Sequence, residues 1–376
     1  MKIYLTQENL KQNSLSTILN YITEKGFASR RDIAASTGFS WGTVSECAAE
    51  LLSKGYLSEE KDTRKSGAGR TGYVLKPSGD KIVSIGLDIN KTGMRAEVIG
   101  FDRQRKHSIY KEFNCTVQSE VIEEATALCD EAFEFCEGKF KVMSIGLAVQ
   151  GSVDSKNGVS IRFPLKSGWI SCSLKQIFEE KYRVFTYVDH DPKCMLIAKA
   201  YELQKVQGEK NDLMLIRIDK GIGLSVMQDG RISDDTDKME LAHTVSEFNG
   251  IECSCGRRGC LEAYSSISGI VNRCGESFEN VLKNKEKYAD ILDDAAKYLA
   301  IAIHNSAMLF YPDIIILTGG LPLMYKEFAD KLSEYFYELE RAQGRKEIKI
   351  CVDTEISAAF GAAIKSSSEA IKNLKI

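Results

Sequence analysis

Three cysteines and one histidine lie close together in the middle of the chain, with the spacing His243-x9-Cys253-x-Cys255-x4-Cys260. Three thiolates and one imidazole supply the four ligands of a tetrahedral zinc ion, and four protein ligands leave no open position for a catalytic water. Two glycines between the ligands allow the backbone to turn tightly. The spacing is not that of a dithiol pair acting on substrates. The motif therefore predicts one structural Zn²⁺ ion, and a short loop that must close around it.

The length and composition indicate an ordinary globular protein with more than one domain. The chain has 376 residues, enough for two or three hydrophobic cores. No apolar run reaches the roughly 18 to 20 residues that span a bilayer, and the first residues lack the apolar segment of a signal peptide. We therefore expect a cytoplasmic protein with no membrane partner. In that setting most of the eleven cysteines are expected to be reduced thiols.

Charge is distributed unevenly along the chain. The net charge of the whole chain is −3, which argues against nonspecific binding to nucleic acid. Residues 1–76, however, contain 11 Lys and Arg against 8 Asp and Glu. A mildly basic N-terminal module therefore precedes an acidic body, and this asymmetry is compatible with a DNA-binding head.

The N-terminal module has the pattern of two short helices joined by a tight turn. A helical stripe of apolar residues runs through 14–25. Ser29 then has the position of an N-cap for a helix that ends at Gly38. Ser40 follows as the cap of a second helix, which begins at Trp41. This arrangement is that of a helix-turn-helix, whose second helix can enter a major groove.

A two-stranded wing is expected directly after the second helix, with basic residues at its tip. The module thus resembles a winged helix-turn-helix repressor head, and the alternative is a helical module that docks only onto protein. Trp41 and Glu46 depart from the pattern, because such regulators often carry basic residues there. The residues expected to contact DNA are Ser40, Trp41, Thr43, Ser45, Arg64 and Arg70.

The remainder of the chain alternates short apolar strands with amphipathic helices. Residues 76–79 form a linker, after which three β-rich runs, a helix near 119–137 and a buried strand near 142–151 follow. A second set of strands begins at 212, with helices near 287–310, 325–341 and 357–372. The pattern of strands followed by helices occurs twice along the chain. It therefore predicts an α/β body of two lobes with a cleft between them.

The zinc motif also carries a specific resemblance. The segment CSCGRRGCLEAYSS, preceded by Glu240-x-x-His243, resembles the signature of the ROK family of repressors and sugar kinases. The resemblance covers about residues 80–370 and implies a two-lobed, actin-like sugar-kinase fold. A winged head in front of that body is similar to the family's repressor branch, which includes xylose repressors.

The resemblance also implies a sugar site. Asp191 stands where the family's kinases keep their catalytic base, and a carboxylate there can accept hydrogen bonds from sugar hydroxyls. His190 replaces an asparagine that normally contacts the sugar, and Met239 and Ala242 replace two glycines of a family motif. The positions that match sugar-binding residues of the family are Gly151, His190, Asp191, Glu240, His243 and Glu262.

The phosphate-binding segments of the family's kinases are altered here. Their first loop, Asp-Ile-Gly-Gly-Thr-Lys, corresponds to residues 88–93, which have lost both glycines of the pair. Their second loop, Gly-Thr-Gly-Ile-Gly, corresponds to residues 219–223, where Asp219 adds a negative charge that would repel phosphate. Phosphoryl transfer depends on positioning and neutralising the phosphates. We therefore expect no kinase activity.

These patterns lead to one leading interpretation and two rivals. The chain is expected to be a sugar-responsive repressor with a head at 1–76 and a body at 77–376, acting on operator DNA as a homodimer or homotetramer. Its effector would be a monosaccharide or a sugar derivative, and either release or promotion of DNA binding is compatible with the sequence. The rivals are an active sugar kinase and a regulator that responds to a sugar phosphate or a protein partner.

Overall fold

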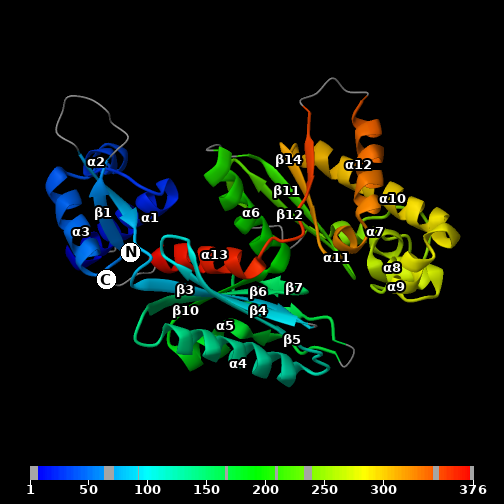
Figure 1. Ribbon diagram of the computed structural model, residues 1–376, viewed down its shortest axis with the longest axis horizontal. Helices are drawn as coiled ribbons and strands as arrows, with labels where there is room; N and C mark the ends of the chain where they lie inside the picture. Colours follow the sequence, from blue (N-terminus) through cyan, green and yellow to red (C-terminus); the bar gives the residue numbers. More distant parts are fainter. Residues whose placement is uncertain are drawn as a thin grey trace, which may run out of the picture. The chain divides into compact units, whose positions relative to one another are not determined.

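The computed structural model describes residues 7–62, 72–91, 93–165, 168–207, 211–232, 239–341 and 347–372. The chain divides into two compact units, each with its own sheet (Figure 1). The first unit comprises Met1–Asp191 and Ala358–Ile376, and the second comprises Pro192–Ser357. Across the described ranges, no helix has both the length and the apolar character needed to cross a bilayer.

The N-terminal head is a winged helix-turn-helix. Its elements are α1 (Gln7–Lys25), α2 (Arg30–Thr37), α3 (Trp41–Ser53), β1 (Leu57–Lys61) and β2 (Tyr73–Pro77). The two strands pair antiparallel, so the predicted wing is confirmed at its base, with Lys76 and Pro77 inside β2 instead of in a linker. The predicted wing-tip residues Arg64 and Arg70 lie outside the described residues.

Local capping fixes the ends of the two short helices of the head. The Ser29 side chain accepts from the Asp32 N–H at 3.2 Å, and the Asp32 carboxylate accepts from the Ser29 N–H at 3.1 Å. Gly38 ends α2 in the left-handed conformation at φ 74°. The Ser40 hydroxyl accepts from the Thr43 N–H at the start of α3. The boundaries predicted for α2 and the start of α3 are therefore confirmed.

A five-stranded sheet forms the centre of the first unit, in the order β10-β6-β3-β4-β5. Helices α4 and α5 cover one face and α13 covers the other (Figure 1). A small sheet of β7, β8 and β9 follows β6 along the chain. The bounds are β3 Ile82–Asn90, β4 Gly93–Gly100, β5 Arg105–Glu112, α4 Gln118–Cys136, β6 Lys141–Val149, β7 Ser152–Asp154, β8 Val159–Arg162, β9 Cys172–Ser173, α5 Leu174–Tyr182, β10 Phe185–His190 and α13 Ala358–Lys372.

Two paired glycines bring α13 unusually close to this sheet. Gly86 on β3 and Gly146 on β6 are neighbours in register. A Cβ atom at Gly86 would lie 1.8 Å from the carbonyl oxygen of Ala359, and one at Gly146 would lie 2.1 Å from that of Ala362. Because any side chain at Gly86 or Gly146 would overlap the backbone of α13, the close packing of this helix on the sheet requires glycine at both positions.

The second unit is built around the sheet β13-β12-β11-β14-β15. Its predicted strands and the helices predicted near 287–310 and 325–341 are confirmed, whereas the shorter helices between the zinc motif and residue 288 were not predicted. The bounds are α6 Asp191–Gln207, β11 Leu213–Ile218, β12 Ile222–Gln228, β13 Arg231–Ile232, η2 Leu241–His243, α7 Leu261–Ser265, α8 Ile267–Cys274, α9 Phe278–Lys283, η3 Lys285–Tyr288, α10 Ala289–Phe310, β14 Ile314–Thr318, α11 Gly320–Met324, α12 Lys326–Glu340 and β15 Lys349–Val352.

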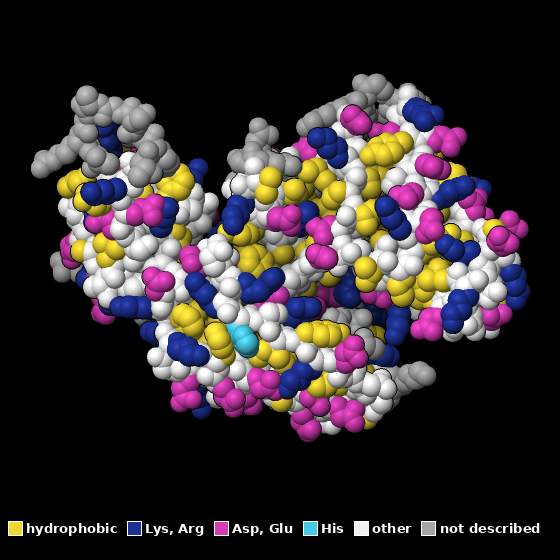
Figure 2. All heavy atoms as spheres, viewed as in Figure 1, with side chains coloured by type: hydrophobic (Ala, Val, Ile, Leu, Met, Phe, Trp, Pro, Cys, Tyr) yellow, Lys and Arg dark blue, Asp and Glu magenta, His cyan; other side chains and the backbone are white. Residues whose placement is uncertain are grey.

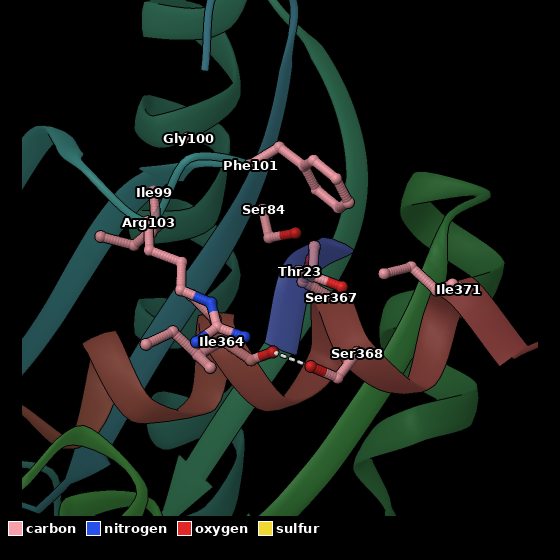
Figure 3. A pocket seen from close by; sticks show the side chains of 11 residues that line it. Thr23, Ser84, Ile99, Gly100, Phe101, Arg103, Ile364, Ser367, Ser368 and Ile371 are labelled. Atoms are coloured by element: carbon pink, nitrogen blue, oxygen red, sulfur yellow. Dashed lines mark hydrogen bonds between the residues drawn. The ribbon is translucent and has the colours of Figure 1, made fainter. Parts of the chain in front are cut away.

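The hydrophobic core of the head continues into the rest of the first unit. Buried residues of α1, α2 and α3 share one cluster with Phe101, Met143 and the end of α13. Beside this cluster, Thr23 of α1 lines a small pocket together with Ser84 of β3 and Ser367 of α13 (Figure 3). The head and the end of α13 are therefore parts of one packed structure.

Candidate functional site

The histidine and cysteines of the zinc motif come together in the second unit. Their ligand atoms all lie within 4.8 Å of one another, with Cys255 Sγ 3.7 Å from Cys260 Sγ and Cys253 Sγ 3.8 Å from His243 Nδ1. A tetrahedral zinc ion with Zn–S bonds of about 2.3 Å holds two sulfur ligands about 3.8 Å apart. The donor set and its spacing therefore fit one four-coordinate metal ion.

Backbone geometry and a tyrosine network hold the candidate metal-binding loop, residues 243–260, which carries the His/Cys cluster. Gly256 and Gly259 have φ values of 83° and 79°, so the tight turns expected between the ligands require glycine. The Tyr264 hydroxyl accepts from the Ile251 N–H at 2.7 Å and donates to the Glu247 carboxylate at 2.9 Å. These contacts tie both sides of the loop to α7.

The protein environment favours different protonation states of two ligand thiols. Hydrogen bonds from the backbone N–H and the guanidinium of Arg257 lower the pKa of Cys255 to about 6. Burial raises the pKa of Cys260 to about 12. A bound divalent cation deprotonates coordinating thiols. Such an ion would therefore hold Cys260 as a thiolate in spite of its burial.

His243 has a different neighbour at each ring nitrogen. Its Nδ1 faces the sulfur of Cys253, whereas its Nε2 lies 3.9 Å from the Oε2 atom of Glu240. Metal-bound histidines commonly place the second nitrogen next to a carboxylate, which orients the ring. Glu240 remains half exposed. Its position therefore allows it to orient His243 and also to contact a ligand.

Glu262 lies between the metal-binding loop and the β11–β12 turn. It belongs to the first turn of α7, directly after Cys260 and Leu261. One of its carboxylate oxygens accepts from the Ser254 hydroxyl at 3.4 Å. A Cβ atom at Gly221 would lie 2.7 Å from the other oxygen. The second unit thus brings Glu240, His243 and Glu262 to one loop cluster.

The first unit contributes a separate group at the end of β10. His190 Nε2 lies 3.4 Å from Asp191 Oδ1, and Asp191 is only 2% exposed at the start of α6. The preceding Asp189 has another role, because it is fully buried and accepts hydrogen bonds from the Ser155 hydroxyl and the His190 N–H. Asp189 therefore anchors the end of β10 within the first unit.

Gly151 follows β6 and occupies a position that only glycine fits. Its φ is 104°, and a Cβ atom there would lie 2.1 Å from the carbonyl oxygen of Arg162. The first unit thus holds three of the residues predicted to bind sugar, namely Gly151, His190 and Asp191. The other three belong to the second unit.

The two segments predicted to correspond to phosphate loops are both β-hairpin connections. Asn90 and Gly93 pair across the β3–β4 turn, and the Lys91 ammonium donates to the Pro164 carbonyl oxygen at 3.3 Å. In the β11–β12 turn, the Asp219 carboxylate accepts from the Lys220 N–H at 2.9 Å. Its other oxygen lies 3.5 Å from the Arg217 guanidinium. The Asp219 side chain therefore folds back onto its own loop.

The predicted DNA-contacting residues at the start of α3 differ in how far their side chains are exposed or already hydrogen-bonded within the head. The hydroxyls of Ser40 and Thr43 are bonded to each other at 2.9 Å as part of the helix cap. Trp41 is 60% exposed and Ser45 is half-buried. On the face drawn in Figure 2, acidic and basic side chains are interspersed, without one broad basic patch among the coloured residues.

The sequence reasoning missed several residues that shape these groups. Tyr264 and Glu247 hold the metal-binding loop, Arg217 lies beside Asp219 of the β11–β12 turn, and Lys91 links the β3–β4 turn to Pro164. Tyr264 lies inside the segment 253–266 and Lys91 inside the segment 88–93, but neither pattern indicates these particular contacts. The fold determines which atoms each side chain reaches.

These features define the class of protein. It has a two-lobed, actin-like α/β body of the sugar-kinase type, a four-ligand His/Cys cluster in its second unit, and a winged helix-turn-helix head. The chain belongs to the ROK family, which matches residues 84–365, and residues 16–58 match a winged helix-turn-helix DNA-binding family.

Individual relatives resemble the chain over different lengths. The xylose repressor of Bacillus spizizenii is 25% identical over 364 residues, which cover 88% of this chain and 89% of the repressor. A ROK family transcriptional regulator, a homologue of the Escherichia coli Mlc protein, has a TM-score of 0.78 at 18% identity and covers 97% of this chain and 98% of its own. A ROK hexokinase from Thermus thermophilus has a TM-score of 0.64 at 21% identity, covering 78% of this chain and 100% of its own.

Proposed function

We propose that this protein is a DNA-binding transcriptional repressor whose operator affinity changes when a sugar binds. The observation that carries the proposal is the presence of a winged helix-turn-helix head and a ROK body in one chain. The likeness to a xylose repressor extends over nearly the full length of both proteins, whereas the hexokinase covers 78% of this chain. The proposed boundary between head and body is residue 76.

We propose that the His/Cys cluster holds a structural Zn²⁺ ion. The contacts that support this are the donor set of one imidazole and three thiols and the sulfur–sulfur distance of 3.7 Å. Bound zinc would fix the loop from which Glu262 and His243 extend, so its role is to organise a ligand site. Cys255→Ser should release the metal, as measured by elemental analysis of the purified protein.

We propose that the effector sugar is bound by the polar residues that match sugar-binding positions of the family. His190, Asp191, Glu240, His243 and Glu262 would supply its hydrogen bonds. Gly151 would provide a close backbone approach to the ligand. A ligand that binds one conformation of the body better than another shifts the population of the two, and this is how a sugar would alter DNA affinity.

We propose that the body has no kinase activity. In support, the Lys220 N–H, which a phosphate oxygen would need, is bonded to the Asp219 carboxylate. That carboxylate would also repel a nucleotide phosphate. A coupled assay with Mg-ATP and a panel of monosaccharides should yield no sugar-dependent ADP, and sugar-dependent turnover would contradict this part of the proposal.

The repressor is proposed to act as a homodimer or a homotetramer. Paired helix-turn-helix heads read inverted half-sites about one helical turn apart, which requires at least two copies of the chain. Sedimentation of the zinc-loaded protein, alone and with a duplex that contains an inverted repeat, would give the number of copies directly.

The sugar response is tested by a thermal-shift screen of monosaccharides and sugar phosphates on the zinc-loaded protein. A stabilising sugar at 100 times its Kd should add about 2.7 kcal/mol to the free energy of unfolding. Asp191→Ala should remove that shift and leave sugar-free DNA affinity unchanged. If no sugar changes either the melting temperature or DNA binding, the sugar-responsive part of the proposal is wrong.

A further inference from the structure

The exposed face of the recognition helix α3 carries one long polar side chain among small residues. Gly42, Glu46, Ala49 and Ser53 follow one another at helical spacing, and all four are exposed. The opposite side of the helix is buried in the core of the head. Glycine, alanine and serine barely extend beyond the backbone. On this stripe, only Glu46 is long enough to approach a base edge deep in the major groove.

The two acidic residues of α3 have different surroundings. The Glu50 carboxylate lies 2.7 Å from the Lys11 ammonium and 3.0 Å from that of Lys54, and its side chain is only 20% exposed. These hydrogen bonds lower the pKa of Glu50. The Glu46 side chain is 73% exposed and lies 3.9 Å from Lys11. Glu50 is therefore engaged within the head, whereas Glu46 points outward beside one compensating positive charge.

The helix has no positive charge of its own to offer to DNA. None of the residues from Trp41 to Ser53 is a lysine or an arginine. A carboxylate in the major groove is repelled by acceptor groups, which guanine (O6 and N7) and thymine (O4) present there. It can accept a hydrogen bond from the amino group at N4 of cytosine, and adenine offers its amino group only next to the acceptor N7.

We propose that Glu46 is a specificity-determining residue that selects a cytosine in each operator half-site. This inference rests on the proposed DNA-binding function and identifies the base that the head reads. The carboxylate accepts from the cytosine amino group and excludes guanine and thymine by repulsion. Lys11 lies on α1 next to Glu46 and reduces the repulsion between the carboxylate and the DNA phosphates.

The test is a selection of binding sequences from randomised DNA duplexes by the full-length, zinc-loaded protein. The wild type should enrich half-sites with one fixed C·G pair. Glu46→Gln should change that position toward A·T, because a carboxamide pairs with N6 and N7 of adenine, and should leave the other positions unchanged. Glu50→Gln is the matched control, since it removes the same charge one turn away, and it should enrich the wild-type sequence.

A second measurement isolates the proposed hydrogen bond. Replacing the selected cytosine by 2-pyrimidinone, which lacks the amino group, should weaken wild-type binding about tenfold or more, and Glu46→Ala binding less than twofold. Because Glu46 is exposed, matching circular dichroism and melting curves should establish that each variant folds.

The outcomes separate the inference from the function on which it rests. If wild type, Glu46→Gln and Glu46→Ala all enrich the same sequence, the role of Glu46 is overturned while DNA binding stays intact. That result would mean that the Glu46 side of α3 does not contact the bases. If the wild type enriches no sequence at all, the DNA-binding function itself is wrong.

Discussion

The two glycines of the metal-binding loop provide a matched pair of substitutions with very different expected effects. Gly256 and Gly259 have nearly the same left-handed φ, so an alanine at either position costs about 1 kcal/mol in backbone conformation. A Cβ atom at Gly256 meets nothing within 4 Å. At Gly259, the new Cβ would lie 1.8 Å from the carbonyl oxygen of Glu247, where ordinary contact begins at 3.4 Å.

The additional cost at Gly259 follows from the hydrogen bonds that surround it. Its carbonyl oxygen accepts from the N–H groups of Ser246 and Glu247, and its own N–H donates to the Ile251 carbonyl oxygen. Relieving the overlap requires a shift that breaks these three bonds, at about 1 kcal/mol each. Gly259→Ala should therefore cost about 3 kcal/mol more than Gly256→Ala. Because the next residue, Cys260, is a proposed metal ligand, we expect this cost to appear in zinc affinity, as a factor of roughly 100.

Competition against a chromophoric zinc chelator at fixed pH measures this difference in the full-length proteins. Gly256→Ala should retain zinc within about tenfold of the wild type, and Gly259→Ala should bind it far more weakly. If the two variants bind zinc with equal affinity, the loop either accommodates the side chain or does not hold the ion, and the reasoning fails.

Three further predictions concern the head, the first unit and the metal. Ser29→Ala removes the N-cap of α2 and should destabilise the head by about 1 kcal/mol; hydrogen exchange of the α2 amides would measure this, and unchanged exchange would contradict it. Gly86→Ala should lower the free energy of unfolding by about 3 kcal/mol, because its Cβ would overlap the backbone of α13. Gly72→Ala is the control, since a Cβ there meets nothing within 4 Å, and equal melting temperatures of the two variants would refute the close packing. Removing zinc with a chelator should increase hydrogen exchange in residues 239–265 and leave the head unchanged; uniform loosening of the chain would show that the metal has a wider role.

Local sequence signals predicted the parts of the structure that depend on neighbouring residues. Ser29 and Gly38 predicted both ends of α2 because capping involves groups within one turn. The spacing of the His/Cys motif predicted that His243 and the three cysteines would come together, because short loops restrict where their side chains can lie. The zinc ion and the sugar contacts stay predictions.

Side-chain contacts that no motif specifies could not be predicted in the same way. Nothing in the sequence near Asp219 indicates that its carboxylate turns back onto the Lys220 N–H, or that His243 directs its second nitrogen toward Glu240. The surface against which α13 packs could not be predicted either. The small residues of α13 suggest close packing, but only the fold shows that they meet Gly86 and Gly146.

The position of α13 in the chain has a consequence for the order of folding during synthesis. The first unit needs this helix to cover its sheet, and the core of the head includes Ala370 and Ile371 from its end. The ribosome must make all of Pro192–Ser357 first, which at about 5 to 20 residues per second takes on the order of 10 to 30 s. During that interval one apolar face of the nascent sheet has no cover, so the DNA-binding head, although made first, is among the last parts to be completed.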